Sequence, residues 1–210
     1  MKYKVMIVED QTMPRELFEL RIQASEHFEV ALSIDNAALA DVYCLRVPVD
    51  LILMDVVTRG GESGLDAAER IKRAFPRIKI IIVTSMPECS YLSRAREIGV
   101  ESFWYKEEQR ESLLDVMERT MAGESVYPDA TPELQLGLAS SYKFTDRELE
   151  VLREMTGGDT NQEIAERLHM SVATVKSHIL NMLEKTGFRN RTELAVRARE
   201  SGLVILNRKN

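Results

Sequence analysis

Residues 51–55 read Leu-Ile-Leu-Met-Asp, a short apolar run that ends in a carboxylate. Residues 5–8 and 80–83 form two further runs of the same kind. Strands that are buried on both faces of a parallel sheet have this continuous apolar character, whereas half-exposed strands alternate between apolar and polar residues. We therefore predict that the three runs form the centre of a parallel sheet.

Amphipathic segments separate these runs and favour helices between the strands. Two weaker strand candidates are residues 29–33 and 102–105. The predicted helices cover residues 14–25, 37–46, 65–75, 88–98 and 110–121. Five strands that alternate with five helices are typical of an α/β doubly wound domain built on a five-stranded parallel sheet. Such sheets bind ligands beyond the carboxyl ends of their strands.

Reactive side chains follow the predicted strands at those carboxyl ends. Glu9 and Asp10 follow the first strand, Asp55 the third, Thr84 the fourth and Lys106 the fifth. Three adjacent carboxylates repel one another unless a cation lies among them, and oxygen ligands favour a hard ion such as Mg²⁺. Asp55 is then the candidate nucleophile for a phosphoryl group, whose oxygens Thr84 and Lys106 are suited to bind.

Each of these residues also has an ordinary structural interpretation. Acids at strand ends often cap helices, Thr84 fits a turn, and Lys106 fits a solvated surface charge. Their occurrence at the carboxyl ends of four strands of one predicted sheet favours a joint site over independent roles.

The segments VMIVEDQ (5–11), LILMDV (51–56), IIIVTS (80–85) and FWYKE (103–107) resemble the receiver domain of two-component response regulators, over residues 1–122. The resemblance implies that Glu9 and Asp10 bind Mg²⁺, that a histidine kinase phosphorylates Asp55, and that Thr84 and Lys106 sense the phosphoryl group. Phe103 occupies the position of the family's switch aromatic, without the hydroxyl of the commoner tyrosine.

The loop after Asp55 departs from the family pattern. Residues 55–64 read DVVTRGGESG, which lacks the usual Met-Pro pair and places Gly64 nine residues after the aspartate instead of eight. We expect a loop that is one residue longer than usual. The resemblance implies that the backbone carbonyl of Val57 is a further metal ligand.

The remaining residues predict a connecting segment and a helical domain. Gly, Pro, Ser and Ala dominate residues 123–143, so we predict a linker there with at most one helical turn. Capping-box patterns at Thr145–Glu148 and Thr160–Glu163 start two helices, and Ser171 caps a third. A short helix, a tight turn and a longer helix make a helix-turn-helix, so residues 144–210 are predicted to form a small all-α domain.

The outward face of the third predicted helix is polar and suits contact with DNA. Arg189 and Arg191, which follow this helix, are placed for flanking phosphates. A generic helical bundle with a solvated basic face remains an alternative from periodicity alone. The residues of the outward face that are candidates for DNA contact are Thr174, Lys176, Ser177 and Asn181.

Residues 144–195 resemble the LuxR-type DNA-binding domain through T-x-R-E, N-x-E-I-A, T-V-K-x-H and R-N-R-T. The resemblance implies that Lys176 and Ser177 contact bases, while Thr174, Asn181 and Arg191 hold phosphates or the fold. Leu180 replaces a basic residue found in some members, which favours an apolar contact with a thymine methyl group.

Together the two resemblances indicate the NarL/FixJ class of response regulators. They imply a DNA-binding transcription regulator that a sensor histidine kinase phosphorylates and that binds double-stranded DNA as a homodimer when active. RNA polymerase is a further candidate partner. The formal net charge is −6, yet nine basic and three acidic side chains lie from Arg167 onward, which fits an acidic domain followed by a DNA-binding one.

Other protein classes fit the sequence less well. We expect no enzymatic turnover: a Mg²⁺ phosphatase resembling haloacid dehalogenases needs an aspartate where this chain has Val57. A phosphorylation-independent DNA binder, whose receiver only dimerises, stays open because of the altered loop and Phe103. Two cysteines without a metal-site or disulfide pattern, and the lack of a signal peptide or long apolar run, predict a cytoplasmic protein without a membrane segment.

Overall fold

The computed structural model describes residues 2–59, 62–86, 89–106, 111–129 and 131–204. The chain folds into two compact units, with residues 2–85 and 91–129 in the first and residues 131–204 in the second. Among the described residues, no helix combines the length and the apolar character needed to cross a membrane.

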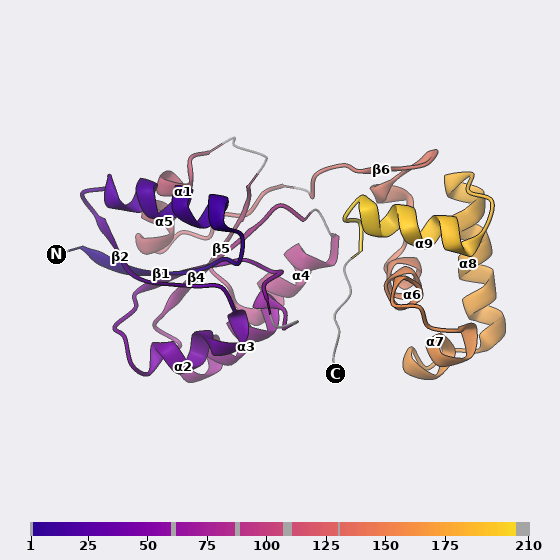
Figure 1. The fold of residues 1–210 in the computed structure, drawn as a ribbon, viewed down its shortest axis with the longest axis horizontal. Helices are drawn as coiled ribbons and strands as arrows, with labels where there is room; N and C mark the ends of the chain where they lie inside the picture. Colours follow the sequence, from indigo (N-terminus) through magenta and orange to yellow (C-terminus); the bar gives the residue numbers. More distant parts are fainter. Residues whose placement is uncertain (1, 60–61, 87–88, 107–110, 130, 205–210) are drawn as a thin grey trace. The chain divides into compact units, whose positions relative to one another are not determined.

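The first unit is built on a five-stranded parallel sheet of order β2-β1-β3-β4-β5 (Figure 1). The fold class predicted from the apolar runs is therefore confirmed. Every residue of the central strand β3 is buried, as its continuous apolar run requires. The strands are β1 (Tyr3–Val8), β2 (Phe28–Ile34), β3 (Leu51–Met54), β4 (Lys79–Thr84) and β5 (Ser102–Tyr105).

Helices cover both faces of this sheet. Figure 1 shows α1 and α5 on one face and α2 and α3 on the other. Phe18 and Ile22 of α1 and Val116 and Met117 of α5 pack against one face of the strands in a common core. The helices are α1 (Thr12–Gln23), α2 (Ala40–Cys44) after the 3-10 turn η1 (Ala37–Leu39), α3 (Gly64–Ala74), α4 (Cys89–Ile98) and α5 (Leu113–Met121). The predicted starts at Glu88 and Arg110 lie outside the described residues.

The two ends of the loop after β3 are tied together. An isolated antiparallel bridge joins Val57 to Ser63, and the amide of Gly64 donates to the carbonyl of Val56 at 2.8 Å. A Cβ atom at Gly64 would lie 1.9 Å from the backbone oxygen of Asp55, so only glycine fits here. Thr58 ties the loop to the earlier turn η1, because its Oγ1 accepts from the amide of Ala37 at 2.9 Å.

The segment predicted as a linker, residues 123–143, is more structured than its composition suggests. It contains a hairpin of two-residue strands, β6 (Gln135–Leu136) and β7 (Ala139–Ser140), and the 3-10 turn η2 (Ser141–Lys143). Leu136 and Ala139 are buried in the hydrophobic core of the second unit. Within residues 131–204 the second unit is therefore helical apart from this hairpin. The hairpin was not predicted, because strands of two residues are too short to show a periodic pattern.

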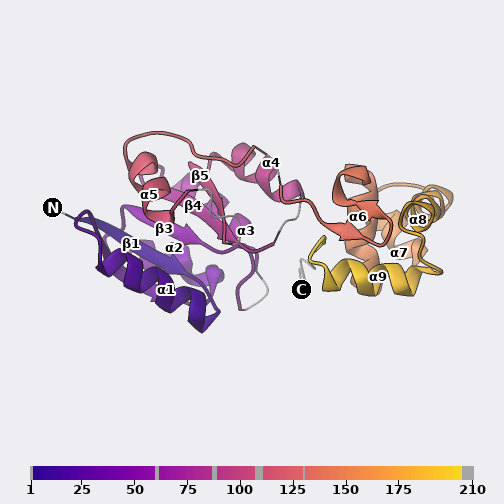
Figure 2. The ribbon, with the colours of Figure 1, turned by 90° about the horizontal axis from the view of Figure 1, so that it is seen from above.

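Within residues 131–204 the second unit contains four helices, three of which the capping patterns predicted (Figure 2). Both predicted capping boxes are formed, at Thr145 with Glu148 and at Thr160 with Glu163. The fourth helix, α9, was missed, although Asn190 caps it by accepting from the amide of Glu193. The helices are α6 (Asp146–Thr156), α7 (Asn161–Arg167), α8 (Val172–Thr186) and α9 (Arg191–Glu200).

Candidate functional site

Three carboxylates meet at the carboxyl edge of the sheet. The register continues past the strand ends, since the amide of Asp55 donates to the carbonyl of Val8 at 2.9 Å. One carboxylate oxygen from each of Glu9, Asp10 and Asp55 lies within 4.8 Å of the others. Glu9 and Asp55 are buried and Asp10 is partly exposed, so the cluster opens to solvent through Asp10.

Lys106 supplies the positive charge beside this cluster. Its Nζ donates to Glu9 Oε2 at 2.5 Å and to Asp55 Oδ2 at 2.9 Å. The lysine reaches both acids because its backbone amide donates to the carbonyl of Thr84, which extends the pairing of β4 with β5 by one residue. One ammonium group therefore serves two buried carboxylates.

Burial and neighbouring charges shift the pKa values of Asp55 and Lys106. Burial raises the pKa of Asp55 from 3.8 to about 6, with a further rise from Glu9, although Lys106 opposes both. Burial alone would lower the pKa of Lys106, but the two carboxylates beside it raise that pKa above its ordinary value. Asp55 is thus an ionised carboxylate at neutral pH whose charge is only partly balanced, which suits both a nucleophile and a metal ligand.

The remaining predicted residues of the first unit lie on β4, on β5 and in the loop after β3. Thr84 is fully buried at the end of β4. Phe103 is also buried, with its ring centroid 5.0 Å from that of Tyr105 and 6.3 Å from that of Tyr127. The amide of Val57 donates to Asp55 Oδ1 at 3.4 Å, so the loop backbone reaches the aspartate.

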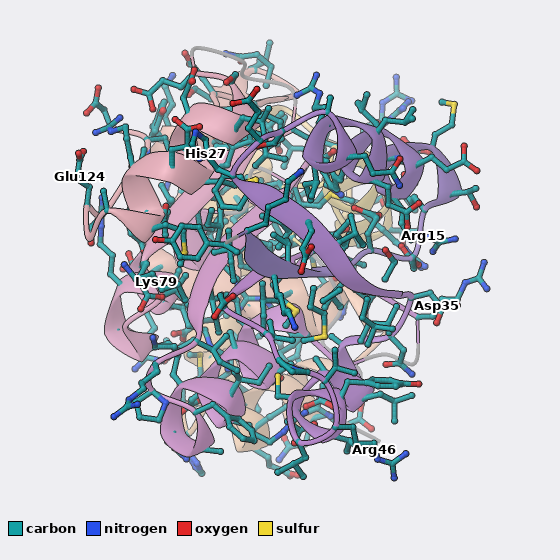
Figure 3. The ribbon with its side chains drawn as sticks, turned by 90° about the vertical axis from the view of Figure 1, so that its left-hand side faces the viewer. Arg15, His27, Asp35, Arg46, Lys79 and Glu124 are labelled. Carbon is teal, nitrogen blue, oxygen red and sulfur yellow. The ribbon has the colours of Figure 1, made fainter. Side chains whose placement is uncertain are left out.

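Arg15 lies at this edge of the sheet and was missed from the sequence. Arg15, labelled in Figure 3, donates from Nη1 to the backbone carbonyl of Glu9 at 2.8 Å, which fixes the turn that presents Glu9 and Asp10. The amide of Gln11 donates to Glu9 Oε1 at 3.0 Å and fixes the same acid. The signal was available, because Arg15 lies in the first turns of the helix that directly follows the acid pair.

The second candidate site is the outward face of α8. Val175, Ile179 and Met182 bury the inner face of this helix. Ser171 caps the helix by accepting from the amide of Thr174 at 3.0 Å, so its amino-terminal end is well formed. The predicted DNA-contacting residues on the opposite face are all exposed, namely Thr174, Lys176, Ser177, Leu180 and Asn181.

The two predicted arginines have different surroundings. Arg189 is exposed. Arg191 is partly buried, and its guanidinium donates to Asn161 Oδ1 at 3.0 Å and to the carbonyl of Asp159 at 2.8 Å. These bonds tie the start of α9 to the start of α7, so Arg191 holds the fold of the unit.

Both units match known protein families. Residues 5–118 match the response regulator receiver domain, and residues 142–198 match the bacterial regulatory proteins of the luxR family. The chain belongs to the response regulator family. Its pairing of a receiver domain with a LuxR-type helix-turn-helix is that of a response regulator acting as a transcription factor.

Relatives of this response regulator align along its whole length. The response regulator protein VraR of Staphylococcus epidermidis is 31% identical, over 97% of this chain and 100% of its own. VraR of Staphylococcus aureus is 30% identical with the same coverage. RcsB from Salmonella enterica serovar Typhimurium, solved bound to promoter rprA in the presence of phosphomimetic BeF3-, shares the fold with a TM-score of 0.62. It is 21% identical and covers 93% of this chain and 98% of its own.

Proposed function

We propose that a sensor histidine kinase phosphorylates Asp55 and that this modification controls DNA binding by the C-terminal unit. The observation that carries the proposal is the contact of Lys106 with both Glu9 and Asp55 at the carboxyl edge of the sheet. Asp55 Oδ attacks phosphorus, the bond from phosphorus to the donor nitrogen breaks, and the nitrogen keeps the electron pair. Lys106 and Thr84 then bind the oxygens of the new acyl phosphate.

The donor set of the carboxylate cluster fits Mg²⁺. Glu9, Asp10 and Asp55 offer only carboxylate oxygens, which a hard divalent ion prefers. We propose that these three acids hold the ion together with the carbonyl of Val57. The ion would supply positive charge that offsets the repulsion among the acids and the phosphoryl oxygens.

For DNA binding we propose the exposed face of α8 as the recognition surface. Lys176 and Ser177 contact bases, Thr174, Asn181 and Arg189 contact phosphates, and Leu180 contacts a thymine methyl group. One such unit covers little DNA, so the active form is a homodimer on paired half-sites. The functional boundaries are then 1–122 for the receiver and 144–210 for the DNA reader, with the second half of 123–143 packed into the latter.

The intact mass of the full chain after incubation with Mg²⁺ and a small phosphodonor tests the proposal. We expect one phosphoryl adduct on the wild type and none on Asp55→Asn. Asp35→Asn is a matched control, because Asp35 also follows a strand but its half-exposed carboxylate pairs with Arg59. An adduct on Asp35→Asn alongside none on Asp55→Asn assigns the site.

Operator binding by phosphorylated and unmodified protein tests the second half of the proposal. We expect tighter, dimeric binding after phosphorylation, and equal binding by both forms would contradict the switch. That result would instead favour a regulator that binds DNA independently of phosphorylation and whose receiver only dimerises.

A further inference from the structure

The chain that leaves α5 returns to the open edge of β5 within the first unit. β5 is the last strand of the sheet, so its outer edge has no neighbouring strand in the sheet order. The amide of Phe103 donates to the carbonyl of Val126 at 2.8 Å, and the amide of Val126 donates to Ser102 Oγ at 3.1 Å. Val126 therefore pairs with this edge in place of a sixth strand.

A buried hydroxyl pair anchors this contact. Thr120 Oγ1 donates to the carbonyl of Val116 at 2.6 Å, so Ser102 Oγ donates to Thr120 Oγ1 at 2.7 Å. Both hydroxyls are fully buried. Lys79, labelled in Figure 3, donates from Nζ to the carbonyl of Thr120 at 2.6 Å and thereby caps the end of α5. Strand, helix end and returning chain are thus joined through side chains with satisfied hydrogen bonds.

Tyr127 adds an aromatic contact to the backbone pairing. Its hydroxyl donates to the carbonyl of Val100 at 2.7 Å, and the guanidinium of Arg96 lies 4.7 Å from its ring centroid. Its ring contacts Phe103, which in turn contacts Tyr105, so three rings form a row from the returning chain into β5. Burial raises the pKa of the Tyr127 phenol to about 12, so the hydroxyl stays a donor at all physiological pH values.

The same strand carries Lys106 to the carboxylate cluster. β5 has four residues and ends at Tyr105, directly before Lys106. In the arrangement described, Lys106 bonds the free carboxylates of Glu9 and Asp55 while the chain at Val126 and Tyr127 is docked. A phosphoryl group on Asp55 would give Lys106 a new partner. A displacement of Lys106 towards that partner would pull on β5, the short strand whose outer edge pairs with Val126.

We infer that Val126 and Tyr127 form a clamp that couples the phosphorylation site to the segment leading into the DNA-binding unit. The clamp is formed while Lys106 binds the free carboxylates of Glu9 and Asp55. Phosphorylation of Asp55 loosens the contacts of the clamp with β5. Phe103, which has no hydroxyl of its own, transmits the change through its contact with the Tyr127 ring. The inference rests on the proposed function, because it requires a phosphoryl group at Asp55.

Linkage fixes the sign of the expected effects. If the phosphorylated arrangement loosens the clamp, then weakening the clamp must favour the phosphorylated arrangement by the same factor. Substitutions at Tyr127 are therefore expected to tighten the binding of a phosphoryl mimic, and the mimic is expected to lower amide protection at Phe103 and Val126.

The test is a beryllofluoride titration of the full chain with Mg²⁺. Trp104 is the single tryptophan and lies between Phe103 and Tyr105, so its fluorescence reports on β5. For Tyr127→Leu we expect a midpoint about fivefold lower than for the wild type. Tyr127→Phe keeps the ring and loses only the bond to Val100, so its midpoint should fall between the two. Tyr142→Leu is the control, because Tyr142 also donates to a backbone carbonyl, that of Thr131, but belongs to the second unit.

Amide hydrogen exchange at Phe103 and Val126 in the wild type, with and without beryllofluoride, provides the reciprocal measurement. Faster exchange with the mimic, together with the ordered midpoints, supports the clamp. An unchanged or higher midpoint for both Tyr127 variants overturns it, as does unchanged or slower exchange in a wild type that binds the mimic. A wild type that takes up neither a phosphoryl group nor beryllofluoride overturns the proposed function itself, and the coupling with it.

Discussion

Each unit contains a buried carboxylate that a lysine contacts, Asp55 in the first and Glu148 in the second, and the pKa values of these two acids shift in opposite directions. Asp55 in the first unit is 3% exposed and Glu148 in the second is 2% exposed. Burial raises the pKa of Asp55 to about 6. Burial would also raise the pKa of Glu148, but the hydrogen bonds from Lys185 and Thr145 lower it below its ordinary value.

The difference lies in how well each carboxylate is satisfied. Glu148 accepts from Lys185 Nζ with both oxygens, at 2.8 and 2.7 Å, and from the amide of Thr145 at 2.8 Å. Asp55 shares Lys106 with Glu9 and accepts one long bond from the amide of Val57. A carboxylate that stabilises the fold has hydrogen-bond partners for both of its oxygens. A reactive carboxylate keeps negative charge that its neighbours do not balance, and this charge is available to a metal ion or a phosphoryl group.

Removal of the structural carboxylate should have the largest effect. Glu148→Ala removes the carboxylate beside Lys185, which keeps only its bond to the carbonyl of Lys143, and also removes one capping box. We therefore expect the second unit to lose about 3 kcal/mol of unfolding free energy. Urea unfolding of the full chain measures this, with helix content by circular dichroism and Trp104 fluorescence to follow the first unit separately. Glu150→Ala, which breaks the exposed pair with Arg147, should cost at most about 0.5 kcal/mol. Similar losses for both variants would refute the distinction.

Removal of the reactive carboxylate should have the opposite sign. Because the folded pKa of Asp55 is about 6 and its unfolded value is 3.8, the ionised form destabilises the folded state at neutral pH. Asp55→Asn should therefore stabilise the first unit by about 2 kcal/mol at pH 7 without Mg²⁺. The gain should shrink as the pH falls from about 6 towards 4, where the wild-type carboxyl takes up its proton. Asp35→Asn is the control, and a destabilised Asp55→Asn protein would show that Asp55 is a structural acid.

Binding of Mg²⁺ should offset the destabilisation that ionised Asp55 causes in the wild type. At ten times its dissociation constant, Mg²⁺ should stabilise the first unit by about 1.4 kcal/mol, measured as a rise in the Trp104 unfolding midpoint. The rise should weaken as the pH falls through about 6, since protons compete with the ion for Asp55. It should also weaken in Asp10→Asn. Equal stabilisation at pH 5 and pH 8 would place the ion elsewhere.

The fold and the candidate site could be predicted from the sequence only in part. The sheet and the meeting of Glu9, Asp10 and Asp55 followed from apolar runs, because parallel strands align their carboxyl ends at one edge. The return of Val126 to Ser102 and Phe103 could not be predicted, since it joins residues more than 20 positions apart through one edge contact. Helix α9 was missed because the N-cap pattern of Asn190 with Glu193 was not recognised.

The smallest expected effect is at the exposed face of α8 in the second unit, where no buried charge destabilises the fold. Leu180 is 57% exposed on α8 and so contributes little to the fold. Its loss in Leu180→Ala should leave unfolding unchanged and weaken operator binding about fourfold, by about 0.8 kcal/mol, the value of a small apolar contact. Replacing the contacted thymine with uracil should weaken wild-type binding by a similar factor and leave the variant unaffected, because both changes remove one contact. Leu45→Ala, at a 74% exposed leucine of the first unit, is the control. If the variant loses affinity equally for thymine and uracil operators, Leu180 positions α8 and does not contact the methyl group.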